Sequence, residues 1–154
     1  MCFGAGRADQ HDMRCLAVTA LAALTLAAAA QATIKPARGM SGITLGMTPT
    51  QVYAKLGRPV GKSRTRWYYA RVWVGFRGRR VVEVTTTRST ERLANGLGVD
   101  SSESEVRAAY PQATCGQAGA FRRCRLGTGA PRTRVTDFVF GHGRVIQVTV
   151  QLLP

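Results

Sequence analysis

The fold is indicated most clearly by Leu45-Gly46-Met47-Thr48-Pro49-Thr50-Gln51-Val52. This stretch returns later in the chain as Leu97-Gly98-Val99 and Ser102-Glu103-Ser104-Glu105-Val106. A second stretch behaves in the same way: Phe76-Arg77-Gly78-Arg79-Arg80-Val81-Val82-Glu83-Val84 returns as Phe140-Gly141-His142-Gly143-Arg144-Val145-Ile146-Gln147-Val148. An internal repeat determines which structural elements stack on one another. We therefore predict a duplicated unit in which helical elements precede a sheet.

The first returning stretch has the signals of a helix start. Thr48 suits the N-cap, Pro49 the first helical position, and Gln51 completes a capping box. In the second copy, Ser102 and Glu105 take these roles. We expect Val52 and Leu56, and then Val106 and Tyr110, to face the core, with Gly57-Arg58-Pro59 and Pro111 ending the two helices.

Alternation of apolar residues predicts the strands of each copy. The residues expected on the core face are Val72, Val74, Phe76, Val82 and Val84, then Thr136, Phe138, Phe140, Ile146, Val148 and Val150. Those expected on the opposite face include Arg71, Trp73, Val81, Glu83, Asp137, Val145 and Gln147. Arg77-Gly78 and His142-Gly143 suit hairpin tips, since glycine tolerates positive φ. Earlier strands are expected at 63–69 and 120–126, and residues 92–94 are expected to be helical.

The predicted fold class is therefore α+β. It consists of two tandem helix-helix-β-meander repeats, residues 33–88 and 89–154, forming one compact unit. The antiparallel sheet carries its helices on one face, and the other face stays in contact with water.

Residues 1–32 are expected to be an N-terminal extension followed by a secretory signal peptide, and to be removed from the mature chain. Met13-Arg14 is a cationic start, the Ala/Leu run from Leu16 to Ala30 is apolar, and Ala30-Gln31-Ala32 fits a cleavage site. The run is shorter than the roughly 20 residues of a membrane span, so we expect secretion, extracellular or periplasmic, and no stable span in the mature chain. Met1 and Met13 both remain open as the true start.

Cleavage near Ala32 would remove Cys2 and Cys15 and leave the pair Cys115 and Cys124. An even pair in an oxidising compartment predicts a disulfide, here at the base of a hairpin or loop. A metal site would need more ligands than these two and His142, so no metal or cofactor is expected.

The chain carries a formal net charge of +14, and most of its basic residues are arginine. Planar guanidinium groups suit phosphate and carboxylate recognition. The codon usage of a GC-rich genome explains the arginine, alanine and glycine content equally well, and both explanations remain open.

The motifs Gly46-Met47-Thr48 with Gln51-Val52, Leu56-Gly57-Arg58-Pro59, and the Trp67 and Tyr69 pair resemble the β-lactamase-inhibitor-protein-like fold. The resemblance covers Ser41 to Leu152. It implies a non-catalytic protein-binding module that uses the exposed face of its sheet, and the paired cysteines resemble the hairpin disulfides of that group. Inhibition of a β-lactamase does not follow, because a fold does not carry its function with it.

Catalytic interpretations are disfavoured by the residues present. His142 is the single histidine after residue 32, and no Gly-x-Ser-x-Gly motif exists. Glu103 and Glu105 are better explained as first-turn helix charges, and Glu83 and Asp137 as partners of arginines. Gly57 to Ser63 is one residue short of a phosphate loop and follows a helix instead of preceding one.

Two binding hypotheses remain. In the first, an envelope or extracellular protein binds the exposed face, because Trp, Tyr and Arg dominate interface hot spots. Its candidate residues are Trp67, Tyr69, Arg71, Trp73, Val81, Glu83, Asp137 and Gln147, with Arg71 and Trp73 at the centre. In the alternative, anionic polymers (nucleic acid, teichoic acid or acidic glycan) bind two arginine clusters. Those clusters are Arg77, Arg79 and Arg80, and Arg122, Arg123 and Arg125.

Overall fold

The computed structural model describes residues 33–154, so the expected signal peptide, its cleavage near Ala32, Cys2 and Cys15 lie outside the described residues. No helix in the described part is long and apolar enough to cross a membrane. The elements are β1 (Gly39–Met40), β2 (Ile43–Thr44), α1 (Pro49–Leu56), β3 (Gly61–Lys62), β4 (Arg66–Tyr69), β5 (Val72–Arg77), β6 (Arg80–Thr86), α2 (Glu103–Ala109), β7 (Thr114–Ala118), β8 (Phe121–Leu126), β9 (Arg134–Gly141) and β10 (Arg144–Leu152).

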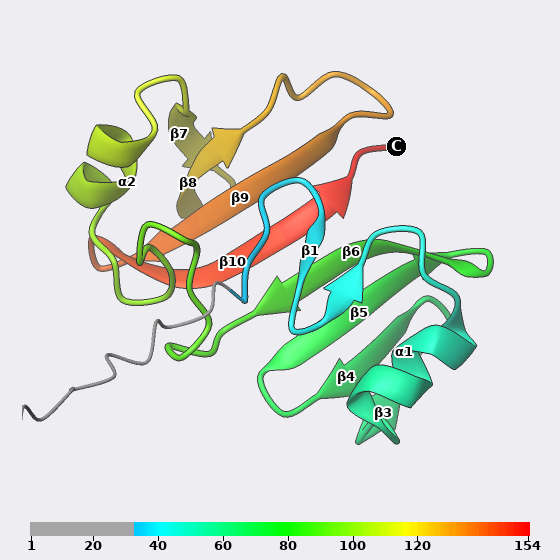
Figure 1. Ribbon diagram of the computed structural model, residues 1–154. Helices are drawn as coiled ribbons and strands as arrows, with labels where there is room; N and C mark the ends of the chain where they lie inside the picture. The colour runs from blue at the N-terminus through cyan, green and yellow to red at the C-terminus, as the bar shows by residue number, and fades with distance from the viewer. Residues whose placement is uncertain (1–32) are drawn as a thin grey trace, which may run out of the picture.

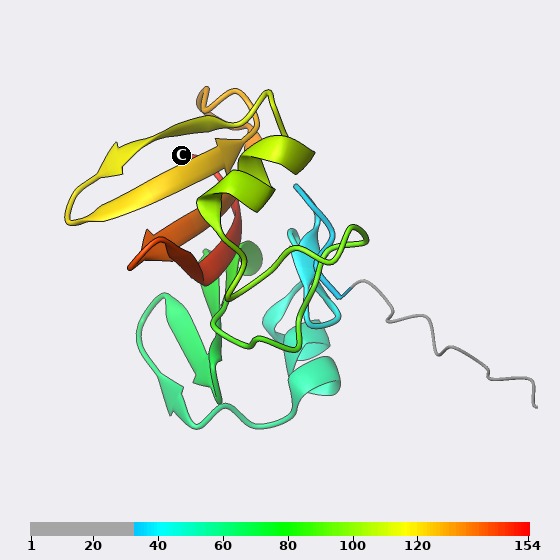
Figure 2. The same ribbon diagram turned by 90° about the vertical axis from the view of Figure 1, so that its left-hand side faces the viewer.

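Eight of the strands form one antiparallel sheet in the order β3-β4-β5-β6-β10-β9-β8-β7. β3 to β6 form one half of this sheet and β7 to β10 form the other, and the two halves meet at the β6–β10 pair, as Figures 1 and 2 show. β1 and β2 form a separate small hairpin. The described residues therefore form a mostly antiparallel sheet with two helices, which is an α+β or mainly-β class.

Both helix starts form as the sequence predicts. Thr48 accepts a hydrogen bond from the backbone N–H of Gln51, whose side chain accepts one from the backbone N–H of Thr48. Ser102 and Glu105 make the same reciprocal pair at α2. Such caps satisfy backbone donors that would otherwise have no partner at a helix start. Gly57 ends α1 at a positive φ of 73°.

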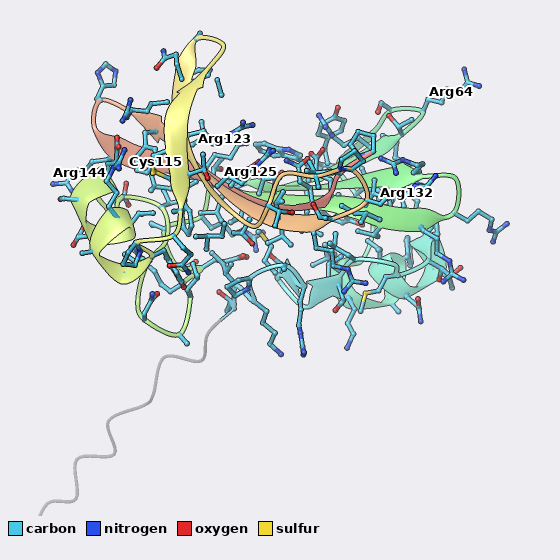
Figure 3. The ribbon with its side chains drawn as sticks, turned by 90° about the horizontal axis from the view of Figure 1, so that it is seen from above. Arg64, Cys115, Arg123, Arg125, Arg132 and Arg144 are labelled. Atoms are coloured by element: carbon cyan, nitrogen blue, oxygen red, sulfur yellow. A yellow bond between two sulfur atoms is a disulfide. The ribbon has the colours of Figure 1, made fainter. Side chains whose placement is uncertain are left out.

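The hydrophobic core lies between the helices and one face of the sheet. Val52 of α1 and Val106 of α2 have 0 % exposure and belong to the same cluster as the inward residues of the sheet. Figure 3 shows the sheet with α1 and the β1–β2 hairpin on one side of it. The inward residues with no exposure are Val72, Val74, Val84, Cys124, Phe138, Val145, Val148 and Val150.

Two β-bulges reverse part of the predicted alternation. Pairing shifts between Gly75 and Phe76, and Phe76 then faces Val81, so Val82 is the extra residue of β6. The shift between Val145 and Gln147 makes Ile146 the extra residue of β10. The prediction that Val82 and Ile146 face the core was therefore wrong. A bulge places two residues of one strand opposite one of its partner, and this changes which of two adjacent apolar residues points inward. Val81 and Val145 are buried in their place.

Other local predictions were also wrong. Residues 92–94 are not helical but lie in a turn closed by a bridge between Arg92 and Gly98, so each half has one helix. Thr114–Ala118, for which no strand was predicted, is the edge strand β7. Each half therefore contributes four strands to the sheet and not the three of the predicted meander.

Candidate functional site: the open face of the sheet

The face of the sheet opposite the helices carries a row of side chains that crosses seven of its strands. The strand registers place directly opposed residues side by side, beginning with Tyr68 of β4 beside Trp73 of β5. Strands lie about 4.8 Å apart, so the row extends about 29 Å. In order, its members are Tyr68, Trp73, Thr85, Thr149, Asp137, Arg125 and Thr114. We call this surface the open face.

Four of the residues predicted for partner binding do not lie on the open face. Val81 is buried in the core because of the bulge in β6. Arg71 precedes β5 in the β4–β5 turn at a φ of 60°, so the strand alternation does not extend to it. Trp67 and Tyr69 point toward the helices and pack against the core; the Trp67 ring lies 5.0 Å from that of Phe76.

Tyr69 illustrates the environment on the covered side. Its hydroxyl donates a hydrogen bond to the carbonyl of Gly57, just after α1. Burial raises the pKa of Tyr69 above its ordinary value, and the neighbouring Tyr53 adds to the rise. Tyr69 therefore fastens α1 to the sheet and is not available to a partner.

The other four predicted residues, Trp73, Glu83, Asp137 and Gln147, do lie on the open face. Sequence reasoning missed Tyr68, which is 39 % exposed and stands beside the half-buried Trp73. A signal was present in the sequence. If Ala70 and Arg71 are recognised as a two-residue turn, antiparallel pairing places Tyr68 opposite Trp73.

Glu83 is held on the open face by an arginine from two strands away. The guanidinium of Arg66 on β4 donates to both carboxylate oxygens of Glu83 on β6, at 2.9 and 3.1 Å. Gly75 of β5 lies between them and leaves room for this contact, since a Cβ there would come within 3.0 Å of the Glu83 Cβ. The pair is exposed enough to contribute little to stability.

Asp137 is more deeply enclosed than Glu83. Its carboxylate accepts two hydrogen bonds from Arg125, both 2.7 Å, and one of 2.8 Å from Gln151. Arg123 adds a longer ion pair at 3.8 Å. The Asp137 hydrogen bonds hold the Arg125 guanidinium in its charged form and raise its pKa further. The contacts of Asp137 therefore tie β8, β9 and β10 together across the open face.

A hollow of about 420 Å³ lies on the C-terminal half of the open face. Val139, Gln147 and Thr149 contribute to its lining together with Asp137. Phe121 and Ile146 line it as well, and they are 50 % and 40 % exposed. Ile146 reaches this position because it is the extra residue of the β10 bulge. Apolar side chains exposed beside a polar floor provide the mixed lining typical of binding sites.

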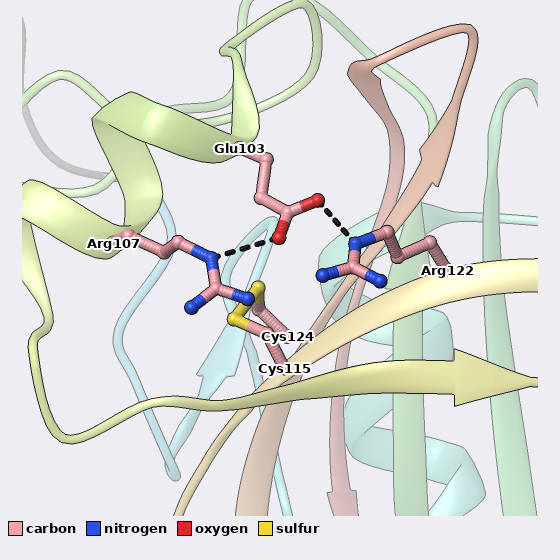
Figure 4. Close-up of a disulfide and its surroundings, with 5 residues drawn as sticks. All are labelled: Glu103, Arg107, Cys115, Arg122 and Cys124. Carbon is pink, nitrogen blue, oxygen red and sulfur yellow. Dashed lines mark hydrogen bonds and ion pairs between the residues drawn. A yellow bond between two sulfur atoms is a disulfide. The ribbon is translucent and has the colours of Figure 1, made fainter.

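The predicted disulfide is present and joins β7 to β8 through Cys115 and Cys124. Figure 4 shows Glu103 of α2 above it, between Arg107 and Arg122. Hydrogen bonds from Arg122 and then Arg107 lower the pKa of Glu103, and the pKa of Arg122 rises in turn. The ion pair with Arg122 of β8 anchors Glu103, and with it α2, to the sheet. Because both sulfurs are used in the disulfide, the cysteines supply no metal ligands.

These ion pairs change the interpretation of the two arginine clusters. Arg122 and Arg125 hold Glu103 and Asp137, and Arg123 also lies near Asp137. Two acids therefore neutralise that cluster in part, and one of them, Glu103, also pairs with Arg107. The residues of the other cluster, Arg77, Arg79 and Arg80, are exposed at the β5–β6 hairpin.

No family model and no curated protein sequence matches this chain. Among solved structures, the chain is similar to a DUF4309 family protein (YjgB) from Bacillus subtilis, with a TM-score of 0.56 and 14% identity, over 80% of this chain and 90% of that one. It is also similar to an extracellular protein containing a SCP domain from Bacillus anthracis, with a TM-score of 0.52 and 14% identity. That match covers 70% of this chain and 43% of the other, so the chain spans less than half of that protein.

At this identity the likeness concerns the fold alone. The two structures do not test the resemblance to the β-lactamase-inhibitor-like fold, which stays a prediction. Within the described part of the chain, the Cys115–Cys124 disulfide is consistent with an oxidising compartment, and so with secretion.

Proposed function

We propose that the protein is a secreted, non-catalytic binding module whose open face docks another extracellular or envelope protein. The observation that carries the proposal is the pairing of Tyr68 with Trp73 on that face. The same face also holds the hollow that Phe121 and Ile146 help to line. Tyr and Trp bury large areas at low entropic cost and are enriched in interface hot spots.

The electrostatics of the open face support binding over catalysis. Glu83 and Asp137 both accept hydrogen bonds from arginines, so fixed partners already occupy their carboxylate oxygens. Thr85 and Thr149 bond each other at 3.0 Å in the middle of the row, so their hydroxyls are also engaged. A satisfied polar centre beside exposed aromatic side chains matches the anatomy of a protein interface.

We also propose that the two halves arose by tandem duplication, as in the inhibitor-like fold that the sequence resembles. Thr85 and Thr149, which are 64 residues apart, face each other across the β6–β10 pair. A two-fold axis relating two copies would pass between such equivalent residues. The bulges at Val82 and Ile146 have the same separation. Equivalent backbone bonds link Gly46 to Val81 and Asp100 to Val145.

The experiment uses the immobilised protein to capture partners from the native secretome, washed at about 0.5 M salt to suppress purely ionic contacts. Trp73→Ala is compared with Tyr53→Ala, which removes an aromatic residue that is 51 % exposed on α1. We expect one polypeptide to bind the wild type and Tyr53→Ala, with an affinity at least about 30-fold lower for Trp73→Ala. Equal capture by all three would refute the proposal.

A further inference from the structure

Six arginines from three connections gather at one end of the sheet, the end at which β5 finishes and β6 begins. All six residues are exposed. Figure 3 labels two of them, Arg64 and Arg132, at this end. The set, which we call the arginine end, consists of Arg64 in the β3–β4 loop, Arg77, Arg79 and Arg80 at the β5–β6 hairpin, and Arg132 and Arg134 at the start of β9.

The backbone pairing brings these residues together. The N–H of Phe76 donates to the carbonyl of Thr65 at 2.7 Å, which holds the β3–β4 loop beside the end of β5. Arg77 is directly paired with Arg80. Arg134 begins β9, which reaches the same end because the sheet is antiparallel in the order β4-β5-β6-β10-β9. Four strand spacings of about 4.8 Å give the arginine end a width of about 19 Å.

The charges of the arginine end have no acidic partner within residues 33–154. The side chains of Arg64, Arg77, Arg79, Arg132 and Arg134 make neither hydrogen bonds nor ion pairs there, and Arg80 donates to the carbonyl of Gly46. The acids on β6 and β9, Glu83 and Asp137, are already held by Arg66 and Arg125. Like charges within about one Debye length, such as those of the directly paired Arg77 and Arg80, repel one another unless an anion lies between them.

We propose that the arginine end binds a linear phosphodiester polymer through its backbone phosphates. Guanidinium groups grip phosphate oxygens in pairs, and a row about 19 Å wide engages several successive phosphates. The exposed aromatic residues Tyr53, Tyr68 and Phe121 lie on α1, on the open face and at the start of β8, and not at this end. Recognition therefore falls on the phosphate groups and not on stacked bases.

The test measures binding of a fluorescein-labelled twelve-nucleotide oligothymidylate by anisotropy between 50 and 200 mM salt. Five phosphate contacts on a single strand predict a slope of log affinity on log salt of about −3.5, which is an affinity loss of about 100-fold over this range. Arg77→Gln, Arg79→Gln and Arg132→Gln together remove three contacts. We expect the triple variant to lose only about 7-fold over the same range.

The matched control is a triple variant with the same net charge, Lys55→Gln, Arg58→Gln and Arg71→Gln, which alters the end of α1 and the β4–β5 turn. We expect it to keep the wild-type slope. Equal slopes for the two triple variants would overturn the proposal, because long-range charge alone would then explain binding. Absence of binding at 50 mM salt would overturn it as well.

Two competitors identify the chemistry that is bound. Inorganic polyphosphate, which has neither sugar nor base, should displace the oligonucleotide at least about ten times more effectively per charge than polyglutamate. Equal displacement by polyglutamate would overturn the assignment to phosphate. The Trp73→Ala variant should bind the oligonucleotide as the wild type does, so this test fails or succeeds independently of the proposed protein interface.

Discussion

Removal of the Asp137 carboxylate is expected to be the most destabilising polar substitution on the open face. The side chain is 4% exposed, and Arg125, its bidentate partner, is 17% exposed. Asp137→Ala would leave the Arg125 charge enclosed without its counter-ion, which costs about 3–5 kcal/mol at buried pairs. Glu83→Ala removes an acid from the same face, but its partner Arg66 is 40% exposed and can turn to water. We expect that variant to lose no more than about 1 kcal/mol.

The assay is urea unfolding followed by tryptophan fluorescence, with the midpoint and the slope fitted for each variant. With a slope of about 1.5 kcal/mol/M, Asp137→Ala should lower the midpoint by about 2–3 M and Glu83→Ala by less than about 0.7 M. A double variant, Arg125→Met with Asp137→Leu, should recover most of the loss because it leaves no enclosed unpaired charge, and Arg123 is 36% exposed and can turn to water. Similar midpoints for the two single variants would show that the enclosed Arg125 charge does not cause the loss of stability.

Three further predictions concern the bulge, the disulfide and the pH dependence. Val81→Thr should lower the free energy of unfolding by at least about 1 kcal/mol because Val81 is buried, whereas Val82→Thr should change it by less than about 0.5 kcal/mol; equal effects would contradict the bulge. Replacing Cys115 and Cys124 by alanine opens a loop of separation 9 and should cost about 2.7 kcal/mol, seen by calorimetry as a lower Tm; an unchanged Tm would count against it. The lowered pKa of Glu103 means that its stabilisation is complete above the ordinary value of 4.5 and is lost as pH falls through the lower folded value. The Tm difference between wild type and Glu103→Gln should therefore be constant from pH 7 to 5 and shrink toward pH 3, and a difference that grew on acidification would exclude the ion pairs as its cause.

Much of the fold was predictable because local chemistry and long-range pairing agree. The capping pairs at Thr48 and Ser102 are complete within four residues, so the sequence alone identifies both helix starts. Strict alternation in Val72-Val74 and in Phe138-Phe140 identifies the core face wherever the strands are regular.

The bulges could not be predicted from the same pattern. Val81-Val82 and Val145-Ile146 are adjacent apolar pairs, so alternation fits equally well in either register, and only the pairing with the neighbouring strand decides between them. Because of this ambiguity, alternation predicted Val81 on the open face and Ile146 in the core, whereas Ile146 lines the hollow.

The candidate site was predicted in part for a similar reason. Trp73, Glu83, Asp137 and Gln147 follow from strand alternation, whereas Arg71 was misplaced because alternation was extended into a turn. Ion pairing depends on contacts between distant residues, so the sequence could not show that Glu103 and Asp137 neutralise the arginines at 122–125. It also could not show which arginines of separate loops meet at one end of the sheet.

A photo-cross-linking measurement tests the binding role of the open face most directly. A benzophenone side chain would replace Tyr68 on the open face in one variant and Tyr53 on α1 in another, both being exposed aromatic positions. After irradiation of the secreting culture, we expect a covalent adduct with a second polypeptide from position 68 and none from position 53. An adduct from position 53 alone, or from neither position, would contradict it.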